Sequence, residues 1–244
     1  MNGAILRMLV LIAVTFVTMK IVVVAVTGTR LTVRQWVAFA GWFGMRPAVF
    51  TRRGKREQTP LVRGLIAIAA GIALLLIARN VQSPGMVFVL ALPALSLILH
   101  FGIVDVTTAL YRRADWPVNE PFRNPLASRS LNEFWSRRWN VGFSEMIAVT
   151  VHRPVRRVAG EPAGLFAAFL ASGLLHEIAI SAPVNAGYGL PTLYFLLHGA
   201  LVAIERRHPQ VASRAWTLFW LAAPLPILFH PWFVRGIVWP LLGR

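Results

Sequence analysis

Four ionisable side chains lie within otherwise apolar stretches of the sequence: His100, His176, Glu177 and His198. Such groups are costly to bury in a membrane and tend to be retained there for function. His176 follows Ser172 by one helical turn, on the same helix face. An imidazole with an ordinary pKa of about 6.5 can accept the proton of an alcohol near neutral pH. His176 therefore suits a general base that acts on a lipid hydroxyl, and the alternative is a histidine that only packs between helices.

Glu177 follows His176 directly, about 100° further round a helix, so it does not stack on the imidazole. We expect it to pair with an arginine or a polar group of a neighbouring helix. A zinc-binding His-Glu-x-x-His motif would need a second histidine at position 180, where the chain has Ile180. The six histidines also lack the clustered spacing of a di-iron site, so we expect no metal.

His198 follows Tyr194 by one turn and precedes Glu205 by two, which places the three residues on one helix face. This position fits either a second group in the cavity of His176 or a histidine that packs between helices. His100 has the weakest sequence argument of the three histidines.

Aromatic and basic residues alternate between Asn124 and Asn140. Ser130 and Glu133 have the spacing of a capping box for a helix that begins at Leu131. The aromatic residues that would anchor this segment at the lipid headgroups are Phe134, Trp135 and Trp139. The guanidinium groups that could bind phosphate are those of Arg129, Arg137 and Arg138. An ordinary interfacial belt with snorkelling arginines would have the same spacing.

The composition indicates an integral membrane protein. The 244 residues are 57% hydrophobic and 14% charged, whereas soluble domains have about 25% charged residues. The formal charge of +16 comes from basic residues clustered between apolar stretches, as in membrane loops and unlike a nucleic-acid interface. The absence of cysteine excludes disulfides, thiol nucleophiles and cysteine-bound metals. The abundance of Arg, Ala and Val favours a bacterial cytoplasmic membrane over the endoplasmic reticulum.

Apolar runs of about 20 residues predict the membrane helices, because that length spans a hydrocarbon core of about 30 Å. The runs are residues 4–27, 61–78, 86–106, 163–184, 190–205 and 216–242. Turn-forming residues at 79–85 and 185–187 predict two helical hairpins, and prolines should kink the last run. We therefore expect an all-α polytopic membrane bundle of about six to eight helices, forming a single domain over residues 1–244.

Residues 35–50 and 131–151 are too short or too polar to span a membrane, so we expect interfacial or re-entrant segments there. The positive-inside rule places the basic loops in the cytoplasm and the uncharged turn at Asn185 on the other side. These basic loops are residues 52–63, 112–138, 153–157 and 206–214. Because basic residues flank 131–151 at both ends, that segment should enter and leave on the cytoplasmic side. The rule does not fix the topology of residues 1–60.

Two motifs in order resemble the paired signature of the wax synthase-like family of membrane-bound O-acyltransferases. They are Ser130-Leu-Asn-Glu-Phe-Trp-Ser-Arg-Arg-Trp-Asn140 and Ser172-Gly-Leu-Leu-His-Glu177. Further similar pieces are Trp42-Phe-Gly-Met-Arg-Pro47, residues 195–206 and Phe229-His-Pro-Trp-Phe233. The related sterol and diacylglycerol acyltransferases share the Trp-Asn ending of the first motif. The chain is short for this family, and Ser136 stands where plant enzymes commonly have glycine. These two differences leave the acceptor pocket undetermined, but not the type of reaction.

The resemblance implies transfer of a fatty acyl group from acyl-CoA, as co-substrate, to the hydroxyl of a long-chain alcohol. It implies no other cofactor and no covalent acyl-enzyme. It also implies that His176 is the catalytic base and that Asn140 assists it. The expected substrate-binding residues are Trp135, Arg137, Arg138, Trp139, Ser172, Glu177 and His198. The expected partners are acyl-CoA, a lipid alcohol and membrane lipids, and not nucleic acid.

Three alternatives stay open at this stage. The acceptor could be another hydroxyl, such as that of diacylglycerol, a sterol or a metabolite. A small-solute transporter could use the buried His and Glu as a proton path, although the sequence has no inverted repeat. The chain could also be a non-catalytic lipid-binding membrane protein, and the presence of both Asn140 and His176 argues against that role.

Overall fold

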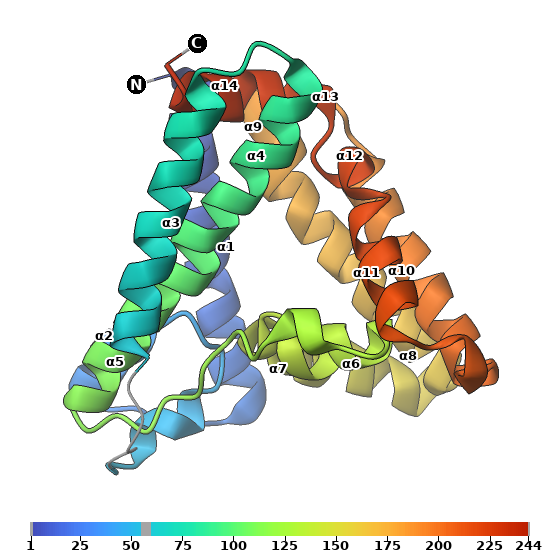
Figure 1. The fold of residues 1–244 in the computed structure, drawn as a ribbon. Helices are drawn as coiled ribbons and strands as arrows, with labels where there is room; N and C mark the ends of the chain where they lie inside the picture. The colour runs from blue at the N-terminus through green and yellow to red at the C-terminus, as the bar shows by residue number, and fades with distance from the viewer. Residues whose placement is uncertain (1, 55–59, 244) are drawn as a thin grey trace.

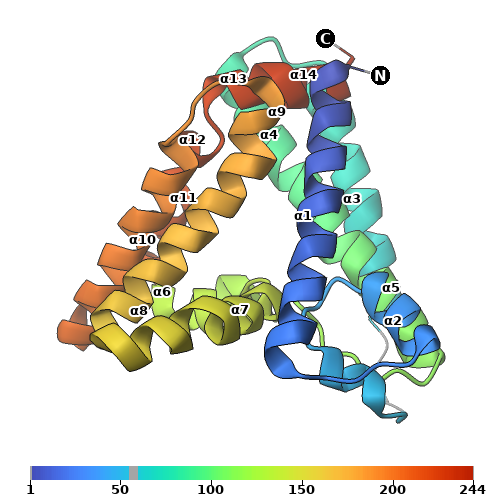
Figure 2. The same ribbon diagram turned by 180° about the vertical axis from the view of Figure 1, so that it is seen from behind.

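The computed structural model describes residues 2–54 and 60–243, and the regular structure of these residues is entirely helical. Two legs of long helices meet at one end, here called the apex, and a third side, the base, joins their other ends (Figures 1 and 2). The first leg contains α1 (Gly3–Thr27), α3 (Leu61–Arg79), α4 (Pro84–Ser96), η2 (Leu97–Ile103) and α5 (Val104–Arg113). The second leg contains α8 (Arg153–His176), η6 (Glu177–Ser181), α9 (Ala182–Val184), α10 (Leu190–Arg207), α11 (Arg214–Ala222) and α12 (Leu225–Leu228).

Short helices form the base and close the apex (Figure 1). At the base lie α2 (Val33–Ala40), η1 (Pro47–Thr51), η3 (Pro125–Ala127) and η7 (Pro209–Val211). The base segment proper, residues 131–152, contains α6 (Leu131–Glu133), η4 (Phe134–Arg138), α7 (Val141–Ile147) and η5 (Ala148–His152). At the apex, α13 (Pro231–Phe233), η8 (Val234–Val238) and α14 (Trp239–Leu241) bring the C-terminus beside the N-terminus.

The expected class, an all-α membrane protein, is confirmed, and the number of clear spans is smaller than expected. In the described residues four helices are long and apolar enough to cross a membrane, or five if the bent pair 214–228 and 231–241 counts as one span. Two physical causes make the number of clear spans smaller than the expected six to eight. The helix α10 has three charged residues within its 18, and prolines break the last apolar run into short helices bent by 67°.

Small residues let the helices of the first leg pack closely. A Cβ atom added at Gly64 would lie 2.9 Å from the carbonyl oxygen of Gly102, and one at Gly71 would lie 2.7 Å from that of Ala94. Ala67, Ala91 and Ala94 are buried in the same leg. Close approach through small residues is a usual way to hold helices together in lipid, where the hydrophobic effect between helices is weak. This packing makes α3 and the α4–η2–α5 run one rigid wall.

Hydrogen bonds at the apex join the two legs. The guanidinium of Arg7 on α1 donates to the carbonyl oxygen of Pro183 on α9, at 2.9 and 2.8 Å. The side-chain amide of Asn2 donates to the carbonyl oxygen of Gly236 on η8 at 3.2 Å. These bonds fix the start of α1 against the ends of the second leg, so the legs diverge toward the base.

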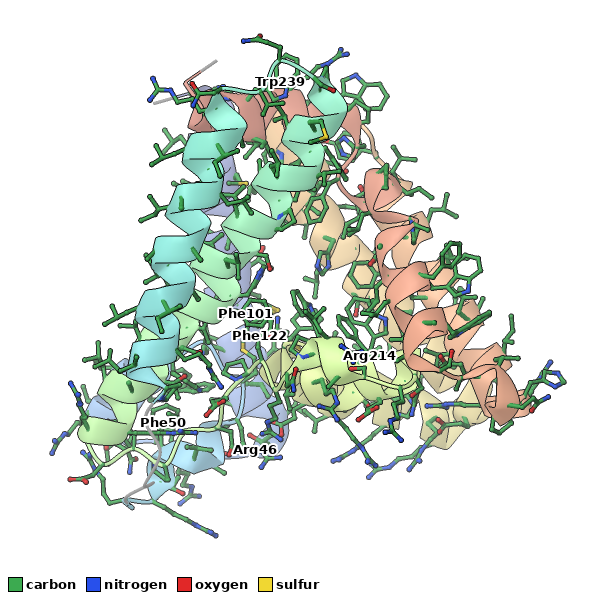
Figure 3. All side chains as sticks on the ribbon, viewed as in Figure 1. Arg46, Phe50, Phe101, Phe122, Arg214 and Trp239 are labelled. Atoms are coloured by element: carbon green, nitrogen blue, oxygen red, sulfur yellow. The ribbon has the colours of Figure 1, made fainter. Side chains whose placement is uncertain are left out.

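The basic loops lie toward the base of the two legs. Arg46 and Arg214 lie at the base, and Trp239 lies at the apex (Figure 3). The turn at Asn185 is at the apex end of the second leg, after α9 (Figure 2). The described parts of the basic loops follow the base ends of the helices, whereas residues 55–59 of the first basic loop lie outside the described residues. The base segment begins and ends at the base (Figure 1).

A kink separates the base from the start of the second leg. Gly160 has φ 84° and ψ 171°, which interrupts α8 between Arg153 and His176. A positive φ of this size favours glycine because other residues are strained there. The apolar helix that carries His176 therefore begins after Gly160, close to residue 163 where the sequence predicts a span.

Lys20, one of two polar breaks in the first apolar run, anchors the 33–51 region to α1. Its ammonium donates to the carbonyl oxygens of Phe39, Trp42 and Gly44 at 2.7, 2.6 and 2.7 Å. The side chain is 2% exposed, and the ammonium lies 3.9 Å from the ring centre of Phe39. All three donors of the ammonium are therefore used to satisfy carbonyls at the end of α2.

Lys20→Met should lower the free energy of unfolding by about 2–4 kcal/mol, because three buried carbonyls lose their donor. It should also speed tryptic cleavage after Arg46 and Arg52, since the 33–51 region loses its anchor on α1. Thermal unfolding and limited proteolysis in detergent measure both effects. Arg34→Met, at an exposed position on α2, is the matched control and should change neither. Equal behaviour of the two variants would contradict the anchoring role.

Candidate active site

The imidazole of His176 is held in one orientation by its own helix. Its Nδ1 lies 2.7 Å from the carbonyl oxygen of Ser172, one turn earlier. Because a carbonyl oxygen only accepts, Nδ1 carries the proton and Nε2 of the neutral ring keeps its lone pair. The ring is partly accessible, and Nε2 has no hydrogen-bond partner among the described residues. His176 is therefore set up to accept a proton from a bound group.

Aromatic rings from the base and the second leg surround His176. The ring centre of Phe195 on α10 lies 4.2 Å from that of His176, and the ring of Phe143 on α7 lies 6.4 Å away. Phe195 is buried and Phe143 is partly accessible. These contacts bring the first-motif segment against the helix of the second motif, although the two are more than 30 residues apart in the chain.

Trp135 connects this cluster to His198. Its ring centre lies 5.4 Å from that of Phe195 and 5.4 Å from that of His198. The indole Nε1 of Trp135 is buried and has no hydrogen-bond partner among the described residues. An indole N–H donates readily, so a bound oxygen atom would satisfy it. His198 is fully buried and its Nδ1 lies 2.9 Å from the carbonyl oxygen of Tyr194. The rings of Trp135 and Phe195 lie between His198 and His176.

The first leg contributes a third histidine. His100 on η2 lies 5.1 Å, ring centre to ring centre, from Trp139 and 5.0 Å from Phe122. Trp139 stacks on Phe134 of the same base segment, with ring centres 5.4 Å apart. Phe101 and Phe122 lie at the inner side of the first leg, just above the base (Figure 3). A continuous set of rings thus runs from His100 through the base segment to His176.

Asn140 lies between two residues of the base segment that contact His100 and His176. Its neighbour Trp139 contacts His100, and Phe143, one turn later, contacts His176. The backbone of Asn140 has φ 42° and ψ 54°, a left-handed conformation that asparagine tolerates better than most residues. Its side-chain amide has no hydrogen bond among the described residues, and its carbonyl accepts from Ser144 N at 3.1 Å. The amide is therefore available to a ligand.

A buried carboxylate fixes the start of the first motif. Glu205 on α10 accepts from the backbone N–H groups of Leu131 and Asn132, at 2.8 and 3.0 Å. It also accepts from the indole N–H of Trp216 at 3.0 Å. Glu205 is 5% exposed, so these three donors are all that the described residues offer it. The carboxylate replaces the missing helical partners of the first N–H groups of α6.

The capping box predicted at Ser130 is half correct. Ser130 Oγ accepts from the N–H of Glu133 at 2.9 Å, as predicted. The carboxylate of Glu133, however, accepts from the N–H of Arg129 at 2.8 Å instead of that of Ser130. This N–H donor, with the guanidinium of Arg138 2.7 Å away, lowers the pKa of Glu133 below its ordinary value. The carboxylate therefore stays charged near neutral pH and stabilises the entry to the base segment.

The two arginines expected to bind phosphate differ in the structure. Arg138 is occupied by Glu133 and also donates to the carbonyl oxygens of Arg123 and Asn124, so its role is structural. Arg137 is exposed and has no ion pair among the described residues. Of the two guanidinium groups, Arg137 is therefore the one positioned for a ligand.

Two further expected ligand-binding residues have other partners. The hydroxyl of Ser172 donates to the carbonyl oxygen of Ala168 at 2.9 Å, so Ser172 acts on the site through its carbonyl, which holds His176. Glu177 Oε1 accepts from the N–H groups of Gly189 and Thr192 and from the Thr192 hydroxyl, at 3.0, 3.0 and 2.8 Å. The expectation that Glu177 pairs with an arginine or a polar group of a neighbouring helix is confirmed in its second form, because the carboxylate accepts from Thr192 and caps the start of α10.

A small pocket at the base lies against the start of α7. Its lining includes Trp42, Arg46, Val141, Gly142 and Glu145, and Arg46 pairs with Glu145 at 2.7 Å. A Cβ atom at Gly142 would lie 2.7 Å from Gly44 Cα and 2.9 Å from Met45 N. These are backbone atoms, which cannot move aside as a flexible side chain can. Gly142 therefore lets the 42–47 segment dock beside Asn140.

Gly142→Ala should separate the 42–47 segment from α7, because the added methyl group overlaps backbone. We expect a destabilisation of about 1–3 kcal/mol and, because Asn140 directly precedes α7, a loss of any activity that depends on it. Thermal unfolding in detergent and turnover measure the two effects. Gly85→Ala is the control, because a Cβ there meets only the Ser83 hydroxyl, at 4.0 Å. A fully active and stable Gly142→Ala would disprove this role.

No group of three or more His, Asp or Glu side chains able to hold a metal ion occurs in the described part of the chain. The site therefore consists of a fixed imidazole, an available asparagine amide, an indole N–H and a wall of aromatic rings. Such a set can move a proton and stabilise a charged oxygen within an apolar chamber.

Comparison with known proteins shows which family part of the chain resembles. Residues 116–197, which run from the loop before the first motif through His176 to α10, match the Membrane bound O-acyl transferase family. The match covers 82 of the 244 residues, so it shows similarity to that family over about a third of the chain. The matched residues include Asn140 and His176, and also Phe143 and Phe195, whose rings lie next to that of His176.

The chain is also similar to several plant proteins. A probable long-chain-alcohol O-fatty-acyltransferase 7 of Arabidopsis thaliana is 30% identical over 196 residues, covering 70% of this chain and 57% of the relative. The long-chain-alcohol O-fatty-acyltransferase of Simmondsia chinensis is 38% identical over 93 residues, covering 34% of this chain and 26% of the relative. An acyl-CoA–sterol O-acyltransferase 1 of Arabidopsis thaliana is 26% identical over 167 residues, covering 60% and 48%. The chain thus matches about half or less of the length of these acyltransferases.

Two residues of this candidate site had little weight in the sequence argument. Glu205 entered the sequence argument only as a face-mate of His198, although it fixes the first motif. His100 had the weakest sequence argument, although it contacts Trp139 of that motif. A signal existed for His100, because it is an ionisable residue in an apolar run with Ser96 one turn before it.

Proposed function

We propose that this protein transfers a fatty acyl group from acyl-CoA to the hydroxyl of a long-chain alcohol, forming a wax ester. The observation that carries the proposal is the fixed tautomer of His176, whose Nδ1–H is held by the Ser172 carbonyl so that Nε2 faces outward as a base. The family match over residues 116–197 and the names of the plant relatives support the reaction class.

The proposed reaction needs only residues already placed. The proton of the alcohol moves to His176 Nε2 as the alcohol oxygen attacks the thioester carbonyl carbon. The carbonyl electrons move to the carbonyl oxygen. N–H donors would stabilise the new negative charge, and the two nearby candidates are the Asn140 amide and the Trp135 indole. Collapse of this intermediate breaks the carbon–sulfur bond, and the CoA thiolate takes the proton back from His176. Ester and free CoA leave, and His176 is again neutral.

The two substrates would approach from different sides. We infer that the base faces the cytoplasm, because the basic loops follow the base ends of the helices. Exposed Arg137 on the base segment would attract the phosphates of CoA, and the acyl chain and the alcohol would come from the bilayer between the legs. The aromatic rings around His176 would keep water from the thioester.

The test is esterification by the purified full-length chain in detergent. Radiolabelled palmitoyl-CoA would be offered with hexadecanol, with a diacylglycerol or with a sterol, in separate reactions. Wax ester from hexadecanol alone supports the proposal. Ester formed only with the sterol or the diacylglycerol would move the acceptor assignment to that alcohol, and no ester with any acceptor would overturn acyl transfer.

A further inference from the structure

A second histidine, on the first leg, lies against the base segment that carries Asn140. His100 lies on η2, a π-helical stretch within the α4–α5 run, and π-helical turns occur often at functional sites. Its ring contacts Trp139, the residue before Asn140, and Phe122, which lies at the inner side of the first leg (Figure 3). His176 contacts Phe143, four residues after Trp139 in the same base segment. The short stretch from Trp139 to Phe143 therefore has an imidazole from each leg beside it, His100 at one end and His176 at the other.

The two imidazoles present different atoms to the space between them. His176 gives its Nδ1 proton to a carbonyl, so its Nε2 is an acceptor. The partner of His100 Nδ1 is instead the hydroxyl of Ser96, at 3.1 Å. The bond can run in either direction, and we assign the Ser96 hydroxyl as its donor, because only this direction pairs the hydroxyl proton, which has no other partner among the described residues. Nδ1 is then the acceptor, and Nε2 of the neutral ring carries a proton.

A hydrogen-bond donor opposite a general base suits acyl transfer. When the alcohol oxygen attacks the thioester, negative charge moves to the carbonyl oxygen, and an N–H aimed at that oxygen lowers the barrier. The ring of His100 is partly accessible, and its Nε2 has no hydrogen-bond partner among the described residues. Its position is fixed by the close packing of the first leg, so the donor is in place before substrate binds.

We propose that His100 is a third catalytic residue, whose Nε2–H donates a hydrogen bond to the acyl carbonyl oxygen of the bound thioester. This assignment rests on the proposed acyl transfer and adds one group to it. His100 donates without losing its proton, so the proton balance is unchanged: the alcohol proton passes through His176 to the CoA thiolate. Ser96 is a positioning residue, because it sets which nitrogen of His100 carries the proton.

The test compares variants that keep or remove the donor. His100→Phe retains a ring of similar size and removes the N–H, and we expect kcat to fall by about 100-fold, as for other lost oxyanion donors. His100→Gln retains an N–H donor and should stay within about 5-fold of wild type, and Ser96→Ala should fall between the two. The KM for palmitoyl-CoA should change little in all three. His208→Phe, at an exposed position after α10, is the matched control.

The outcomes separate this inference from the proposed function. Wild-type kcat in His100→Phe overturns the role of His100 and leaves acyl transfer standing. Equal losses in the Phe and Gln variants, together with a lower melting temperature, would also overturn it, because they indicate a packing role. Absence of ester from the wild type overturns the proposed function, and the role of His100 with it.

A measurement that needs no turnover supplements the kinetics. Diethyl pyrocarbonate modifies unprotonated, accessible imidazole nitrogens, and mass spectrometry locates the modified histidines. We expect modification of both His100 and His176, and protection of both by a thioether analogue of palmitoyl-CoA that cannot be cleaved. Protection of His176 without His100 would place His100 outside the acyl-binding chamber and contradict the assignment.

Discussion

His176→Ala should lower the rate of ester formation by about 10²- to 10⁴-fold, the usual contribution of a general base. The loss should appear in kcat, because the imidazole acts on the alcohol proton in the transition state and contributes little to binding of acyl-CoA. The fold should persist, since the one hydrogen bond of the ring is made within α8 and the neighbouring Phe195 and Phe143 remain. Turnover, acyl-CoA binding and thermal unfolding in detergent measure the three expectations.

Two controls make this result specific. His208→Ala removes an exposed imidazole at the base and should leave turnover unchanged. Imidazole added to His176→Ala should restore part of the activity, because the deleted side chain leaves room for a free base beside Phe195. A variant that retains wild-type turnover would show that another group takes the alcohol proton, and loss of acyl-CoA binding together with turnover would indicate a structural role.

The sequence predicted the helices well because the bilayer leaves few choices. Runs of apolar residues mark α1, α3 and α10 within a few residues of their observed bounds. The same argument overestimated the number of clear spans, because the prolines after Trp216 and the charged end of α10 interrupt runs that composition alone makes apolar. The pattern of apolar residues shows where a helix is favoured locally, but it does not show where prolines or charged residues interrupt that helix.

The site was predicted less completely, because its groups act across elements. His176 stood out as a buried ionisable residue, and its own helix fixes it, so the sequence argument carried over. Arg138, Ser172 and Glu177 have partners four to fifteen residues away, some on other helices, and spacing alone does not show them. Glu205 reaches the first motif more than 70 residues before it in the chain. Such pairs follow from the packing of the helices, which a single sequence does not show.

Glu205→Ala should be the most destabilising of the substitutions considered, because it removes one carboxylate from three donors. The N–H groups of Leu131 and Asn132 and the indole of Trp216 would lose their partner in a buried position. Hydrogen bonds to charged groups contribute about 1.5–3 kcal/mol each, and buried donors left unpaired add to the loss, so we expect about 3 kcal/mol or more. Thermal and denaturant unfolding in detergent measure this loss.

The same substitution should reduce activity beyond its effect on stability. The N–H groups of Leu131 and Asn132 begin the base segment, and that segment places Trp135, Trp139 and Asn140 between the two legs. Without Glu205 the first turn of the segment loses its backbone hydrogen bonds to α10, so the folded fraction of Glu205→Ala should form ester more slowly than wild type, at a temperature well below its melting point.

Graded variants separate the three-donor contact of Glu205, here called the clamp, from a general effect of lost charge. Trp216→Phe removes one of the three donors and should cost less than Glu205→Ala in both stability and turnover. Glu145→Ala removes a carboxylate that is 31% exposed and paired with a 55% exposed Arg46, and it should cost about 1 kcal/mol or less. Equal destabilisation by Glu145→Ala and Glu205→Ala would contradict the clamp. Because Glu205 accepts from the backbone N–H groups of Leu131 and Asn132 and not from their side chains, no side-chain change at these two positions could compensate its loss, so the carboxylate itself sets the position of the first motif.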